Sequence, residues 1–98
     1  MARESAQLWV IMKVEKQRST KDVFVEFITK SFEEKNTIQE KNVLEYTFIN
    51  YGDSNCYINN FPLEPIRIGA GVQSNYKHTF KTNENEFDLT KYSFWFDK

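Results

Sequence analysis

The sequence predicts an all-β domain, either an antiparallel β-sandwich or a small barrel. Short runs in which apolar and polar residues alternate recur along the chain, polar turns separate these runs, and no convincing long helical pattern interrupts them. At 98 residues the chain is expected to form one domain, residues 1–98, because a second core would be too small to hold.

The first strand is predicted in QLWVIMKVEKQ, residues 7–17. Leu8, Val10 and Met12 share one face at a period of two residues, with Trp9 and Ile11 on the other. A strand that is apolar on both faces usually has something covering each of them, so we expect a cover for this second face.

Residues 22–34 allow two interpretations. Val23, Val25 and Phe27 alternate as in a strand. A helical stripe is the other possibility, formed by Phe24, Phe27, Ile28 and Phe32. β-Branched and aromatic enrichment favours the strand, and one short helix remains the alternative. The polar stretch that follows is expected to be a connection or a single helical turn.

The segment VLEYTFIN–YGDSN–CYINNF predicts a β-hairpin with YGDSN as its turn, because glycine, aspartate, serine and asparagine suit tight turns. Pro62 and Pro65 should then break the ladder, since proline has no backbone N–H to donate. Ile66 and Ile68 predict a short strand that ends at glycines. Further on, YKHTFK and FDLTKYSFWF predict strands on either side of the polar turn TNENE.

Composition and charge exclude several classes of function. Aromatic residues make up 16% of the chain, which is too much apolar surface for a disordered protein. The net charge of −1 provides no field that would attract nucleic acid or anionic lipid. Neither a secretion signal nor a membrane span is expected, which favours a protein made and kept in a cytoplasm or in a particle assembled there.

Catalytic and metal chemistry have little support in the sequence. His78 is the only histidine, and its aromatic neighbours favour a packed residue over a catalyst. The lone Cys56 has strand-like spacing typical of a buried structural thiol. The alternating carboxylates Glu84, Glu86 and Asp88 lack the glycine and bidentate ligand of a calcium loop. We therefore expect no enzyme, no cofactor and no metal.

Exposed aromatic residues are the better candidates for function. Trp9, Tyr57 and Trp95 each lie on the less apolar face of a predicted strand. Large aromatic side chains are frequent anchors of protein interfaces. The sequence therefore predicts these three residues as contacts for a partner.

The second half of the chain resembles small virion structural proteins of tailed bacteriophages of Bacteroides-like hosts. The shared pattern is a T-x-x-N-x-G strand end, an x-x-I-N-N strand, a proline corner, a glycine and a final N-E-x-D-x-T-x-Y segment. The matching residues are Thr47, Asn50, Gly52, Ile58, Asn59, Asn60, Pro65, Gly69, Asn85, Glu86, Asp88, Thr90 and Tyr92. Ile66 departs from the pattern, which has a glycine after the proline.

The resemblance implies a β-sandwich capsid auxiliary or decoration protein without catalytic residues, located in the virion. Its expected partners are capsid subunits and other virion proteins, with a homo-oligomer as a further option and nucleic acid or membrane not expected. Two other functions stay open: a small intracellular inhibitor or carbohydrate-binding module that uses the same aromatic residues, and a minimal enzyme centred on His78.

Overall fold

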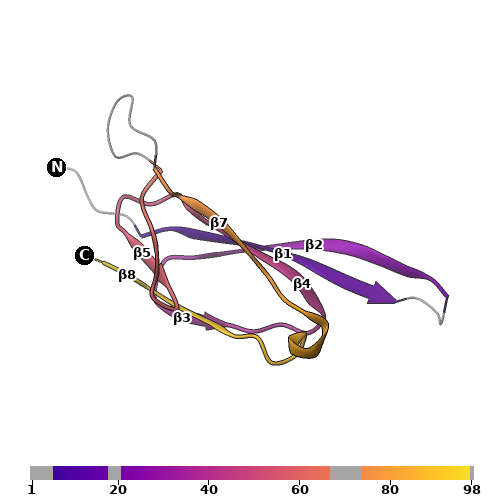
Figure 1. The fold of residues 1–98 in the computed structure, drawn as a ribbon. Helices are drawn as coiled ribbons and strands as arrows, with labels where there is room; N and C mark the ends of the chain where they lie inside the picture. Colours follow the sequence, from indigo (N-terminus) through magenta and orange to yellow (C-terminus); the bar gives the residue numbers. More distant parts are fainter. Residues whose placement is uncertain (1–5, 18–20, 67–73, 98) are drawn as a thin grey trace.

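The structure, a computed structural model, describes residues 6–17, 21–66 and 74–97. Two four-stranded sheets pack face to face, and every strand pair within them is antiparallel (Figure 1). The predicted all-β class and the sandwich alternative are confirmed.

The first sheet has the strand order β2-β1-β4-β7. Its strands are β1 (Leu8–Gln17), β2 (Val23–Phe32), β4 (Val43–Asn50) and β7 (Lys77–Lys81). β1 and β2 pair along their full lengths, whereas β4 pairs with β1 only as far as Val14. The distal end of the β1–β2 hairpin therefore extends beyond the sandwich as a two-stranded ribbon, as Figure 1 shows.

The second sheet is shorter and has the strand order β3-β8-β5-β6. Its strands are β3 (Asn36–Ile38), β5 (Cys56–Ile58), β6 (Phe61–Leu63) and β8 (Tyr92–Phe96). With strands of three to five residues, it covers only part of the first sheet's inner face.

The core lies between the two sheets and is lined by alternate residues of each. Leu8, Val10 and Met12 of β1 are fully buried, as the sequence pattern predicts. Tyr46 and Phe48 of β4 lie beside them and form ring contacts with aromatic side chains of β7 and β8. Each such aromatic pair adds about 0.5–1.5 kcal/mol beyond the burial of its area.

Residues 22–34 contain strand β2, so the helical alternative for this segment is wrong. All ten β2 residues lie opposite β1, so the backbone groups of β2 that face β1 are bonded across the sheet, as in a strand and not as in a helix. The expected connection after β2 contains a third strand, β3, which pairs with β8. Ile66 lies in a bend rather than in the predicted strand, and residues 67–73, including Ile68 and Gly69, lie outside the described part of the chain.

The polar segment TNENE contains a single short turn of 3-10 helix, η1 (Glu84–Glu86). The expected strand beginning at Phe87 starts only at Tyr92, because residues 87–89 continue the turn. Backbone hydrogen bonds from the N–H groups of Leu89 and Thr90 to the Glu86 carbonyl hold this turn closed.

The segment YGDSN connects the two sheets, so its interpretation as a hairpin is wrong. β4 belongs to the first sheet and β5 to the second, and the two strands do not pair. The same residue types suit a hairpin turn and a sheet-to-sheet connection, because both need tight backbone geometry.

Asn50, at the end of β4, fixes this connection from inside. Its side chain is fully buried, and its Nδ2 donates hydrogen bonds to the Ser54 carbonyl at 2.9 Å and the Leu63 carbonyl at 3.1 Å. Its Oδ1 accepts a hydrogen bond from the Gly52 N–H at 3.0 Å. One side chain therefore joins the first sheet, the connecting loop and β6 of the second sheet.

The predicted single strand CYINNF is divided by a tight turn. Ile58 pairs with Phe61, and the two residues between them, Asn59 and Asn60, have φ values of 47° and 75°. Positive φ at both central positions is the geometry of a type I′ hairpin, which asparagine tolerates. Pro62 lies within β6, where it does not break the ladder because β6 is the terminal strand of its sheet.

Replacing Asn50 by alanine should lower the free energy of unfolding by about 3 kcal/mol, because it leaves two carbonyls and one N–H buried without their partners. Chemical denaturation measures this change. The control is Asn55→Ala at an exposed position of the same loop, which should shift stability by less than about 0.5 kcal/mol. Equal effects of the two substitutions would contradict the role assigned to Asn50.

Candidate functional site

Tyr57 and Trp95 lie side by side on the outer face of the second sheet. They are direct cross-strand partners on β5 and β8, with ring centroids 5.8 Å apart and ring planes at 18°. Their neighbours along each strand point into the core, so alternation directs these two side chains outward. Trp95 is 38% exposed. The structure brings together two of the three predicted contact residues.

Pro62 extends this pair into a row. It is the cross-strand partner of Tyr57 on β6 and is exposed on the same face. Adjacent strands are about 4.8 Å apart, so the row from Pro62 through Tyr57 to Trp95 is about 10 Å wide. We call these three residues, two aromatic side chains and one proline, the outer aromatic row.

Polar groups and shallow hollows border the outer aromatic row. The hydroxyls of Thr37 and Ser93 lie 3.0 Å apart on the same face. Trp95 borders two hollows, one of about 280 Å³ beside Glu33–Lys35 and one of about 410 Å³ beside Asn36 and Thr37. An exposed aromatic pair with hydroxyls at its side can pack on a protein surface or stack on a sugar ring.

Trp9 lies apart from the row, on the outer face of the first sheet. Its ring packs on Tyr51, with centroids 4.4 Å apart, and remains 37% exposed. The three predicted contact residues therefore belong to two surfaces on opposite outer faces of the sandwich. Sequence reasoning missed Tyr51, because it directly follows the strand and was assigned to a turn.

Exposed apolar residues of β2 form a further surface that the sequence did not identify. Val23, Val25 and Phe27 are 53%, 45% and 65% exposed. Their alternation indicated a strand, but β2 has apolar residues on both faces, and the pattern alone does not say which face meets the core. The register with β1 settles this point, since Phe27 lies opposite Lys13 on the outer face.

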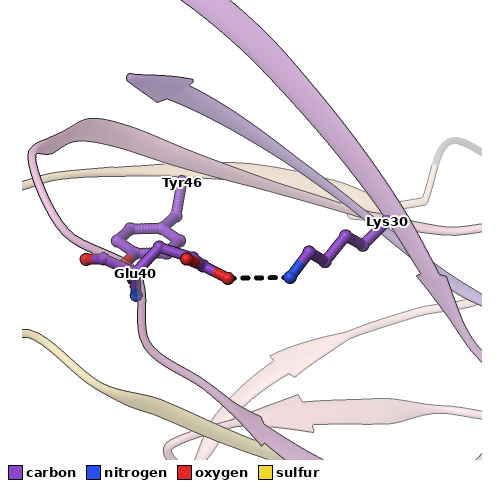
Figure 2. Close-up of polar contacts among 3 residues, drawn as sticks. All are labelled: Lys30, Glu40 and Tyr46. Atoms are coloured by element: carbon purple, nitrogen blue, oxygen red, sulfur yellow. Dashed lines mark hydrogen bonds and ion pairs between the residues drawn. The ribbon is translucent and has the colours of Figure 1, made fainter. Parts of the chain in front are cut away.

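A wide, polar hollow of about 560 Å³ lies between the β1–β2 hairpin and the β3–β4 loop. At its side, Lys30 Nζ and Glu40 Oε1 form an ion pair at 2.7 Å (Figure 2). The Tyr46 hydroxyl accepts a hydrogen bond from the Glu40 N–H at 3.2 Å and donates one to its carbonyl at 3.5 Å.

These contacts hold Glu40 in place as part of the loop structure. Burial raises the pKa of Tyr46, so its hydroxyl stays protonated and able to donate at neutral pH. The hollow contains acidic and basic side chains but neither histidine nor cysteine. In the described part of the chain, no cluster of three or more histidine, cysteine or acidic residues has the arrangement of a metal site.

His78 packs in an aromatic cluster at the rim of the core. Its ring lies 4.2 Å from that of Phe61 and 4.5 Å from that of Phe80. No hydrogen bond joins its ring to any other residue within the described ranges. A general base needs a partner that orients its ring, so this packing resembles that of a structural residue.

Cys56 is fully buried on β5, and burial raises the pKa of its thiol to about 12. The thiolate, which is the nucleophilic form, is therefore scarce at neutral pH. Among the described residues, no helix has the length and apolar character needed to cross a membrane.

Folded protein should not react with a disulfide reagent such as DTNB at pH 8, whereas protein unfolded in guanidinium should react fully at Cys56. The thiol pKa is about 8.5 in the unfolded chain and about 12 in the folded one. The stability that the neutral thiol contributes is therefore complete below pH ~8.5 and lost as pH rises toward 12.

The matched variant for this pH dependence is Cys56→Ala, which keeps every other titrating group. Above pH ~8.5, the stability of the wild type relative to this variant should fall by up to about 1.4 kcal/mol per pH unit. Rapid modification of the folded wild type at pH 8 would show instead that the thiol is accessible and ionised.

Comparison with known proteins identifies no relative in which these surfaces have a known role. The chain matches no protein-family model, no curated protein and no solved structure.

Proposed function

We propose that this chain is a non-enzymatic structural protein of a tailed-phage virion, which packs on capsid subunits as an auxiliary or decoration protein. The observation that carries the proposal is the pair of exposed aromatic surfaces on opposite outer faces of one small sandwich. One surface is the outer aromatic row, and the other is Trp9 with Tyr51.

Two opposite apolar surfaces favour an assembly over a single soluble ligand. One small ligand can cover one face, whereas a subunit packed among others is contacted from several sides. Tryptophan and tyrosine are the residue types that most often dominate binding energy at such contacts. The resemblance of the second half of the chain to small phage virion proteins supports the same assignment.

Apolar and polar groups would contribute differently to the contact with a capsid subunit. The outer aromatic row provides apolar contact area at low cost in side-chain entropy, because the Tyr57 and Trp95 side chains have only two rotatable bonds each. The polar groups beside the row, Thr37 and Ser93, provide hydrogen bonds that fix its orientation on the partner. Trp9 and Tyr51 provide a second contact on the opposite face.

A carbohydrate-binding module is the second candidate, and one observation favours it. The nearly parallel rings of Tyr57 and Trp95 beside paired hydroxyls suit the apolar face and hydroxyl groups of a sugar. This function needs only the outer aromatic row, so it leaves the surface at Trp9 without a role.

The test is whether the chain is present in gradient-purified virions of the phage that encodes it, as measured by quantitative mass spectrometry. The proposal predicts a fixed copy number per particle. For particles made without the chain, Trp95→Ala should weaken rebinding about 30-fold, equivalent to about 2 kcal/mol. The control Leu89→Ala, at a position 74% exposed and outside both surfaces, should rebind as the wild type does.

Absence of the chain from purified virions, although it is abundant in the lysate, would overturn the proposal. Saturable binding of the isolated chain to a soluble oligosaccharide, lost in Trp95→Ala but not in Leu89→Ala, would favour the carbohydrate-binding module instead.

A further inference from the structure

Strand β2 is one of the two terminal strands of the first sheet, and seven of its ten residues are exposed. It is ten residues long, and its one neighbour in the sheet is β1. Its outward-facing Phe27 is 65% exposed, the largest value among the exposed aromatic side chains of the described residues. A long terminal strand with apolar side chains is a template for pairing with another strand.

The other three terminal strands carry features that discourage such pairing. β3 and β6 are only three residues long, and β6 contains Pro62. β7 has five residues and an exposed lysine at each end, Lys77 and Lys81. β2 has no proline and no irregularity in its register with β1. β2 has exposed charged residues of its own, Glu26 and Lys30, but they are opposite in sign, so two copies of the strand can pair them with each other.

We propose that β2 pairs antiparallel with β2 of a second copy of this chain, about a two-fold axis at Ile28. An axis perpendicular to the sheet keeps the inner faces of both copies on one side, so residues of the same face must lie opposite each other. The two-fold axis must therefore pass through a residue and not between two residues. Besides Ile28, the four residues within two positions of it, 26, 27, 29 and 30, could lie on the axis.

The register centred on Ile28 is selected by charge. It places Glu26 of each copy opposite Lys30 of the other, which forms two cross-strand ion pairs on the inner face. A centre at Glu26 or at Lys30 would place like charges opposite each other. A centre at Phe27 or at Thr29 would place both charged residues opposite apolar ones.

The same register also covers the most exposed aromatic residue of β2. Phe27 lies opposite Thr29 of the second copy, and the two Phe27 rings become diagonal neighbours across the axis. Diagonal positions are about 7–8 Å apart, within reach of aromatic side chains. On the inner face, Ile28 meets its own copy. The pairing would join the two first sheets into one continuous eight-stranded sheet.

Lys30 can keep its ion pair with Glu40 of its own chain and also form one with Glu26 of the second copy. Its ammonium group has three donors, and one of them meets Glu40 of the same chain at 2.7 Å. Both Lys30 and Glu26 are exposed, so a second copy can reach them. The residue opposite Glu26 on β1 is Val14, which is uncharged. A single paired edge buries a small area, so the dimer is expected to form in the micromolar range. It requires no partner from a virion and is independent of the proposed function.

The decisive experiment reverses one charge in each of two variants, Glu26→Lys and Lys30→Glu. Both carry Glu40→Gln, so that the reversed residue 30 does not repel residue 40. Sedimentation equilibrium over roughly a hundredfold range of concentration measures the dimer dissociation constant. Each variant alone should dimerise at least about tenfold more weakly than Glu40→Gln, because each places like charges opposite each other.

An equimolar mixture of the two variants should dimerise within about threefold of Glu40→Gln, since lysines of one chain then meet glutamates of the other. Circular dichroism checks that both variants fold. Lys77→Glu in Glu40→Gln, on the terminal strand at the other edge of the same sheet, is the matched control and should leave the dissociation constant unchanged.

A wild-type chain that stays monomeric throughout, or a mixture no tighter than its separate components, would overturn the proposal. Loss of dimerisation in the Lys77→Glu control would do the same and assign the contact to β7. Because no virion is present in these measurements, their failure would leave the proposed packing on capsid subunits intact.

Discussion

The alternation of side chains along β1 is the constraint on which the rest of the structure depends. Leu8, Val10 and Met12 have no exposed surface, and Val14 is 4% exposed. β1 pairs with β2 on one side and β4 on the other, so its register determines which residues of both neighbours face inward. A slip of one residue would turn this whole apolar set to the solvent.

The difference in length between the sheets gives the molecule its exposed surfaces. β1 and β2 have ten residues each, whereas strands of the covering sheet have three to five. The inner face of the hairpin therefore extends past its cover, and β2 lies at the edge with apolar side chains outward. The short strands β5 and β8 turn Tyr57 and Trp95 outward by the same alternation. These contact surfaces therefore follow from strand geometry.

Local pattern predicted the strands of this fold but not their partners. The alternation of β1 and the aromatic pair Tyr57 and Trp95 follow from period-two spacing, which is a local property. The sheet-to-sheet connection by YGDSN depends on β4 and β5 joining different sheets and on a buried hydrogen bond from Asn50 to the Leu63 carbonyl of β6, which no local pattern encodes. The position of Pro62 in a strand depends on β6 being terminal, and the separation of Trp9 from Trp95 depends on which sheet each strand joins.

Site-resolved amide hydrogen exchange of the monomer tests the central role of β1 most directly. Amides of residues 8–14 should exchange only through global unfolding, because β1 is paired on both sides and packed on the core. Amides of residues 16–17 and 23–25, in the extended ribbon, should exchange much faster through local opening, whereas the Glu15 N–H is bonded to the Asn42 carbonyl. Equal protection of the ribbon and of residues 8–14, or weaker protection of residues 8–14, would contradict this role of β1.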